Sequence, residues 1–110
     1  MKLNILKSIT LDVRGESWRF HLLSDRAYTK RFKAGSEALC DLELKEVWFK
    51  KTHFGHGVIA HELMHILFDQ ASVSSSSLDA YQVEELACEI IARSFLEIPY
   101  IVSQIHHTLR

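Results

Sequence analysis

Cysteines and long apolar runs are both scarce in this chain of 110 residues. The two cysteines, Cys40 and Cys88, fall in different expected elements and lack C-x-x-C spacing, so we expect reduced thiols in a cytoplasmic protein. No apolar run approaches the roughly 18 residues that a transmembrane helix needs. The N-terminus also lacks the long apolar region and small-residue cleavage site of a signal peptide. A membrane partner is therefore not expected.

An excess of charge of one sign is absent as well. The formal net charge is −1 with histidine neutral, and the basic residues are scattered. The densest basic stretch, residues 30–33, is short and adjoins an expected turn, so we interpret it as solvated surface and expect no nucleic-acid partner. The hydrophobic share of 47% and charged share of 25% are ordinary for globular proteins. Length and composition predict one domain, residues 1–110, with a modest core.

Apolar residues at every second position predict strands in the first half of the chain. Residues 3–13 and 17–23 alternate on either side of the turn signal Arg14-Gly15-Glu16, which predicts a hairpin. A weaker alternation in residues 38–42 and 47–50 predicts a second hairpin. The N-terminal half is therefore expected to be antiparallel sheet.

Helices are expected mainly in the second half of the chain, at about residues 56–69, 80–98 and 100–109. A shorter helix is expected at about residues 24–32, between the two hairpins. Asp79, followed by Gln82 three residues later, forms a capping-box pattern that opens the helix expected at 80–98. Pro99 ends it, because its ring excludes a hydrogen bond of the preceding turn. The polar run 72–77 predicts a flexible loop, and strands followed by helices give an α+β fold class.

The segment His61-Glu62-Leu63-Met64-His65 carries the functional signal. It has the pattern H-E-x-x-H and is set in an apolar helical run. Residues four apart share one face of a helix, so His61 and His65 can bind one metal ion. Glu62 points beside that metal, where a carboxylate can take a proton from the water that the metal activates. This arrangement predicts the two histidine ligands and the general base of a zinc metallopeptidase.

A catalytic zinc ion usually has three protein ligands, so the motif requires another residue. Glu85 belongs to a charged stripe with residues four apart, which we interpret as solvated. Glu84 instead shares a face with Ala87, Cys88, Ile91 and Phe95, which we interpret as the packing face. A carboxylate is costly to bury there unless it is paired or binds a metal, so Glu84 is the predicted third ligand. The alternative is a partly exposed Glu84 that the dipole of the helix start favours.

Several further residues are weaker candidates. His53 and His56 precede the motif in a glycine-containing stretch, and His106 and His107 lie near the C-terminus. The donor that stabilises an oxyanion remains open among four suitable side chains: Tyr81, Tyr100, His106 and His107. Residues 47–49 could align a peptide by strand addition if they lie at a sheet edge, although Trp48 is better interpreted as core.

Together these motifs resemble the gluzincins, zinc peptidases whose third ligand is a glutamate on the helix after H-E-x-x-H. The stretch Glu84-Glu85-Leu86-Ala87 is similar to the E-x-x-A form typical of ImmA/IrrE-type metallopeptidases, which are small and often phage- or prophage-borne. The resemblance covers about residues 38–99 and implies a minimal zincin-like domain that binds Zn²⁺ through His61, His65 and Glu84, with Glu62 as general base. Cys88 departs from the family, where Asn or Asp is common and can hold a ligand by a hydrogen bond.

The expected function is therefore hydrolysis of peptide bonds in a protein or peptide substrate. Two alternatives stay open: a non-catalytic zinc-binding regulatory protein, and a peptidase that is dormant until a partner binds. Glu62 favours catalysis, because a purely structural zinc site does not need it and usually closes with a fourth protein ligand.

Overall fold

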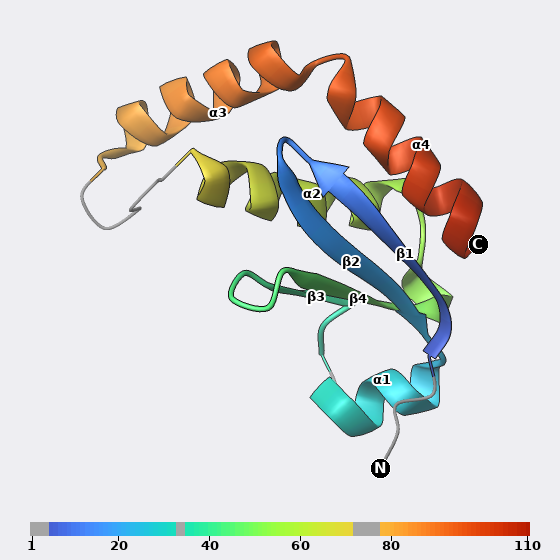
Figure 1. Ribbon diagram of the computed structural model, residues 1–110. Coiled ribbons are helices and arrows are strands. Elements are labelled where there is room, and N and C mark those ends of the chain that lie inside the picture. The colour runs from blue at the N-terminus through green and yellow to red at the C-terminus, as the bar shows by residue number, and fades with distance from the viewer. Residues whose placement is uncertain (1–4, 33–34, 72–77) are drawn as a thin grey trace.

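A computed structural model describes residues 5–32, 35–71 and 78–110 of the chain (Figure 1). The strands are β1 (Ile5–Val13), β2 (Glu16–Leu23), β3 (Ala38–Asp41) and β4 (Glu46–Lys50). The helices are α1 (Asp25–Phe32), α2 (His56–Gln70), α3 (Ala80–Ser94) and α4 (Glu97–Leu109), with a short 3-10 turn at Lys51–His53. The α+β class is thus confirmed, whereas the loop expected at residues 72–77 lies outside the described residues.

The four strands form one mixed sheet in the order β1-β2-β4-β3. Both expected hairpins are present, since β1 pairs antiparallel with β2 and β3 pairs antiparallel with β4. The expectation of a wholly antiparallel sheet was wrong, because β2 and β4 are parallel neighbours. A parallel pair needs a long crossover, and α1 together with β3 supplies it. This crossover leaves β3, not β4, at the edge of the sheet.

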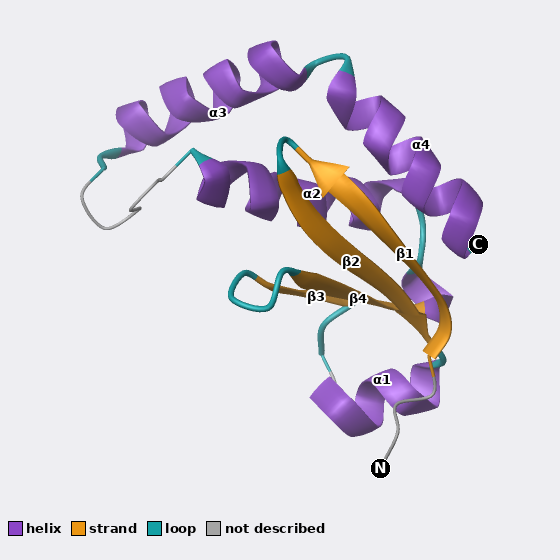
Figure 2. Cartoon of the chain, viewed as in Figure 1, coloured by secondary structure: helices purple, strands orange, loops and turns teal. Residues whose placement is uncertain are grey.

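The sheet is covered on both faces (Figure 2). On one face α2 and α4 pack over the main core, in which Phe20 pairs in register with Val47 and Leu22 with Phe49. On the other face α1 places Tyr28 against Leu23 and Trp48, with which it forms a smaller cluster. Trp48 is 5% exposed, which confirms its expected role as a core residue.

The alternation in β1 directs Ile9, Leu11 and Val13 to the main core, where Val13 is fully buried. The interruption at Lys7 coincides with a register shift between Ile5 and Lys7, and Lys7 Nζ donates a hydrogen bond to the carbonyl oxygen of Arg110. At the other end of the strand, Arg14 and Gly15 both have positive φ, 50° and 91°. Positive φ at both central residues is what a tight two-residue hairpin turn requires.

Side-chain caps are present at the starts of α1 and α3. Ser24 Oγ accepts a hydrogen bond from the Ala27 amide at the start of α1. Asp79 Oδ1 accepts one from the Gln82 amide at 2.8 Å, while Gln82 Oε1 accepts one from the Asp79 amide at 3.0 Å. The capping box is therefore confirmed, because both halves of the exchange are present.

The end of α3 differs from the prediction. The helix ends at Ser94 instead of residue 98, and Pro99 lies in the first turn of α4. A proline ring conflicts with the carbonyl four residues earlier, here that of Phe95, so the helical ladder breaks one turn upstream of the proline. In the first turn of the next helix the missing N–H costs nothing, because it would have no partner there.

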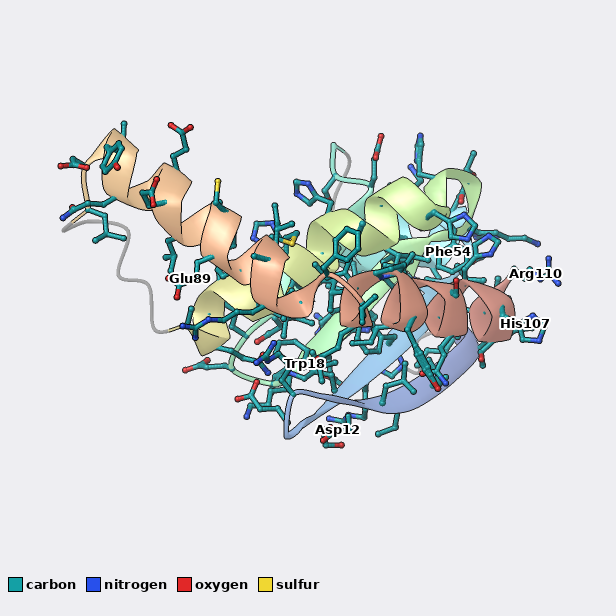
Figure 3. All side chains as sticks on the ribbon, turned by 90° about the horizontal axis from the view of Figure 1, so that it is seen from above. Asp12, Trp18, Phe54, Glu89, His107 and Arg110 are labelled. Carbon is teal, nitrogen blue, oxygen red and sulfur yellow. The ribbon has the colours of Figure 1, made fainter. Side chains whose placement is uncertain are left out.

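Helix α3 is only weakly buried. Of its residues only Ile90 and Ser94 are buried, and its N-terminal end projects past the sheet in both views (Figures 1 and 3). The radius of gyration is 14.5 Å, against about 13 Å for a compact domain of this length. Within the described residues, no helix is both long and apolar enough to cross a membrane.

A partly buried polar network connects the β1–β2 turn to the end of α2. Glu16 Oε1 accepts hydrogen bonds from Gln70 Nε2 at 2.8 Å and Trp18 Nε1 at 3.2 Å, and Glu16 Oε2 accepts one from Lys45 Nζ at 2.9 Å. These bonds, led by that of Lys45, lower the pKa of Glu16 to about 2. Gln70 Nε2 also donates to the Val13 carbonyl, so one carboxylate helps to fix the C-terminal end of the helix that carries the motif.

We expect Glu16→Gln to lower the free energy of unfolding at pH 7 by about 1–2 kcal/mol, a figure reduced for solvent screening of a side chain that is 30% exposed. Because the folded pKa is lowered, the stabilisation is present above about pH 4.5 and disappears as the pH falls toward 2. Urea unfolding between pH 2 and 7 measures this, with Glu43→Gln in the exposed β3–β4 turn as control. An equal pH dependence in wild type and Glu16→Gln would contradict the assignment.

Candidate metal centre

The motif lies in the middle of α2. The side of this helix that faces away from the two histidines packs on the sheet. Ile59, Leu63 and Ile66 are at most 1% exposed and pack in the main core. His61 and His65 stand four residues apart on the exposed side of the helix. The apolar residues that flank the motif therefore hold the backbone, while the two imidazoles remain accessible to a ligand.

The two imidazoles are placed as metal ligands should be. His61 Nε2 and His65 Nε2 are 3.3 Å apart, and the rings are inclined by 77°. Two imidazoles on one tetrahedral zinc ion, with Zn–N bonds of about 2.0–2.1 Å, have their nitrogens about 3.3–3.4 Å apart. Ligand atoms of His61, Glu62 and His65 all lie within 4.8 Å of one another. This group could hold a metal ion.

Glu62 differs from its two neighbours because it faces the protein. Its residue is 6% exposed, and burial raises the pKa of its carboxyl, while the charges of His65 and His61 act in the opposite direction. A raised pKa makes the carboxylate a better proton acceptor. The motif thus combines two exposed nitrogen ligands with one buried carboxylate of increased basicity.

The space in front of the motif is bounded by strand β3. A cavity of about 290 Å³ is lined by Ala38, Cys40 and Leu42 together with the three motif side chains. A second cavity of about 460 Å³ lies against the preceding residues Ser36 and Glu37 and also reaches His61 and Glu62. The motif therefore opens onto a groove between α2 and the edge strand of the sheet.

Cys40 lines this groove, but its thiol is expected to be unreactive at neutral pH. Burial, together with the negative charges of Glu62, Asp41 and Asp69, raises the pKa of its thiol to about 12. A thiol with such a pKa is protonated at neutral pH, and only the thiolate is a nucleophile or a good metal ligand. Both cysteines are free, as expected from the sequence.

The structure does not bring Glu84 into the cluster. Glu84 lies on an exposed part of α3, and the group of possible ligands found among the described residues contains only His61, Glu62 and His65. The interpretation of its helix face as a packing face was wrong, because Ile91 and Phe95 are 47% and 67% exposed. The pattern of apolar residues showed an apolar face of α3, but not that Ile91 and Phe95 are exposed on it.

Two other candidate histidines, His56 and His106, meet at the N-terminal end of α2. The ring centroids of His56 and His106 are 4.0 Å apart, and Phe54 stacks on His106. Burial and the neighbouring charges of His56, Arg110 and His107 lower the pKa of His106. This arrangement is a packing contact between α2 and α4.

The expected oxyanion donors are also outside the groove. Tyr81, Tyr100, His106 and His107 do not line either cavity beside the motif. Tyr100 instead accepts a hydrogen bond from Gln104 on the exposed side of α4. The identity of such a donor stays a prediction.

The sequence did not indicate that β3 forms one wall of the groove beside the motif. The strand proposed as a peptide-aligning edge, residues 47–49, is β4, which lies inside the sheet between β2 and β3. The residues that actually face the motif, Ala38 and Cys40, lie on β3. Their alternation predicted a strand, but only the sheet order shows that this strand is the edge beside α2.

Comparison of the chain with protein-family models, with curated proteins and with solved structures gives no match.

Proposed function

We propose that the protein is a zinc-dependent metallopeptidase that hydrolyses peptide bonds in the groove between α2 and β3. The observation that carries this proposal is the combination of two imidazole nitrogens 3.3 Å apart with a buried carboxylate beside them. The resemblance of the motif to small gluzincins of the ImmA/IrrE type supports the same reaction.

His61 and His65 would hold the metal ion. Zinc fits best, because neutral imidazoles at tetrahedral spacing suit it and because metals such as Mg²⁺ and Ca²⁺ prefer oxygen ligands. When bound, zinc lowers the pKa of water to about 7 and polarises a carbonyl group.

Glu62 would act as the general base. Its burial disfavours the charged carboxylate, which increases its affinity for a proton from water. The protonated carboxyl can then pass this proton to the nitrogen of the leaving amine. Because Glu62 lines both cavities, it can reach a peptide on either side of His61.

Strand β3 would align the substrate. It pairs on one side with β4, and its other side is the edge of the sheet. An extended peptide can add to such an edge through main-chain hydrogen bonds, which places its scissile bond in front of the motif.

A third protein ligand has to come from outside the cluster of His61, Glu62 and His65. The resemblance implies Glu84, which would have to approach from α3. Its position outside the cluster favours the variant of the proposal in which the peptidase is dormant until substrate or a partner draws α3 over the groove. The weak burial of α3 is compatible with such a movement.

Zinc content tests the ligand set. Elemental analysis of the purified protein should give about one zinc per chain, with most of it lost in His65→Ala. Loss of zinc in Glu84→Ala, but not in the matched control Glu85→Ala, would show that Glu84 already binds the metal without substrate or partner; zinc retained in both variants is the result expected of the dormant form. Absence of zinc from wild type after zinc is supplied would refute the proposal.

A further inference from the structure

A hydrogen-bonded triad of polar side chains crosses the face of the sheet opposite to α2. Ser8 on β1 and His21 on β2 are register partners, and Glu46 lies on the next strand, β4. Ser8 Oγ lies 2.6 Å from His21 Nδ1, and His21 Nε2 lies 3.2 Å from Glu46 Oε1. The His21 ring also contacts Trp48, with centroids 5.7 Å apart, and Trp48 belongs to the smaller cluster beside α1. The sheet therefore separates this triad from the metal centre.

The hydrogen bonds determine which ring nitrogen of His21 carries the proton. A carboxylate only accepts hydrogen bonds, so the nitrogen that faces Glu46, Nε2, is the donor. The other nitrogen of a neutral imidazole is an acceptor, and Ser8 therefore donates its O–H to Nδ1. Arg19 Nη2 lies 3.0 Å from Glu46 Oε1 and holds the same carboxylate oxygen in place. His21 is thus oriented as a base that can accept the hydroxyl proton of Ser8.

The serine and its base differ in exposure. The side chains of His21 and Glu46 are 10% and 14% exposed, so packing holds the base and its carboxylate in position. Ser8 is exposed on β1, an edge strand of the sheet, where its hydroxyl remains accessible to a ligand. Among the described residues, no other serine or threonine forms a hydrogen bond to a histidine. A hydroxyl about 2.6–3.2 Å from a base that a third group orients is the signature of an activated nucleophile.

We propose that Ser8 is the nucleophile of a second site, independent of metal, that accepts acyl groups from activated esters. Ser8 Oγ forms a bond to the carbonyl carbon of the ester, and the bond from that carbon to the alkoxy or aryloxy oxygen breaks. The hydroxyl proton passes to His21 Nδ1 and then to the leaving oxygen, while Glu46 stabilises the imidazolium between these transfers. Water then attacks the acyl group on Ser8 by the same proton route, which releases the acid and restores the hydroxyl.

Arg19 can stabilise the negative charge that develops on the carbonyl oxygen. Its register partner on β1 is Thr10, and Thr10 lies two residues from Ser8 on the same face of the strand. The Arg19 side chain is 56% exposed. A guanidinium has several N–H donors, so Arg19 can bind Glu46 and still donate a hydrogen bond to an oxyanion. The site thus combines a nucleophile, an oriented base and an oxyanion donor, which are the parts that acyl transfer needs.

Reaction of the full chain with para-nitrophenyl acetate tests this site. Peptide mass spectrometry should show Ser8 acetylated at least about tenfold faster than Ser17, an exposed serine of β2 on the same face of the sheet. Ser8→Ala should remove the burst of para-nitrophenol that accompanies this acetylation. A chelator should leave the Ser8 rate unchanged, because the triad lies across the sheet from His61 and His65. A rate that falls on chelation would assign the reaction to the metal centre and overturn the proposal.

Two further variants separate an activated serine from one that is only exposed. His21→Gln removes the base and should slow the acetylation of Ser8 at least about tenfold. Glu46→Gln leaves the base without its carboxylate and should slow the same reaction by a similar factor. Acetylation of Ser17 is the matched control and should be unchanged in both variants. Equal rates for Ser8 and Ser17 in wild type, or a Ser8 rate that neither variant lowers, would overturn the proposal. If the substitution at the buried His21 prevents folding, the Glu46→Gln protein decides alone.

Discussion

Glu62→Gln is expected to lower peptide hydrolysis by about 10²–10⁴-fold, the usual contribution of general acid–base catalysis. The substitution keeps the shape of the side chain but removes its ability to accept a proton. The amide also avoids the cost of burying a charge in a residue that is 6% exposed, so the fold should be as stable as wild type or more stable. The measurement is kcat/KM for an internally quenched peptide that wild type cleaves.

The informative control for this prediction is metal content. His61 and His65 are unchanged in Glu62→Gln, so zinc should remain at the wild-type level, whereas His61→Ala should lose both zinc and activity. Activity that persists in Glu62→Gln with zinc bound would show that another group accepts the proton. Loss of zinc in Glu62→Gln would instead make Glu62 a ligand, which its position within 4.8 Å of both histidines permits geometrically.

Phe20→Ala is expected to cost about 3–5 kcal/mol of the free energy of unfolding. Phe20 is 1% exposed, pairs in register with Val47 and stacks on Phe49 with ring centroids 6.5 Å apart. Its removal leaves a cavity at the parallel junction of the two hairpins, where α2 packs on the sheet. The loss is a large share of the 5–15 kcal/mol typical of a domain, and the melting temperature should fall by more than about 12 °C.

Phe95→Ala is the matched control, because it makes the same chemical change at a residue that is 67% exposed. It should alter stability by no more than about 0.5 kcal/mol. Calorimetry of the two variants side by side measures the difference. A comparable loss in both would show that the apolar face of α3 is packed in solution, and would support closure of that helix over the groove.

Local signals in the sequence predicted most of the secondary structure. Alternation, the Arg14-Gly15 turn and the Asp79–Gln82 capping box depend on contacts between residues a few positions apart, and all three are present as expected. The pairing of His61 with His65 is local as well, since one turn of helix sets it. Pro99 marked a real break, but its clash with the preceding turn moved that break to residues 95–96.

Features that depend on distant residues could not be predicted in the same way. The parallel pairing of β2 with β4 makes β3 the edge strand, and this order depends on how the α1 crossover folds back over the sheet. The expected burial of the Glu84 face failed for a similar reason. An amphipathic pattern shows that a face is apolar, but not whether another element is present to cover it.

The sequence by itself determined the chemical group at the centre of this protein: two imidazoles and a carboxylate on one helix, held together by the 3.6-residue period. Only the tertiary structure decided what surrounds that group. It placed β3 in front of the motif and buried Glu62 while leaving both histidines exposed. The physical reason is range, because helix periodicity acts over four residues, whereas burial and charge depend on every element that folds into the same space.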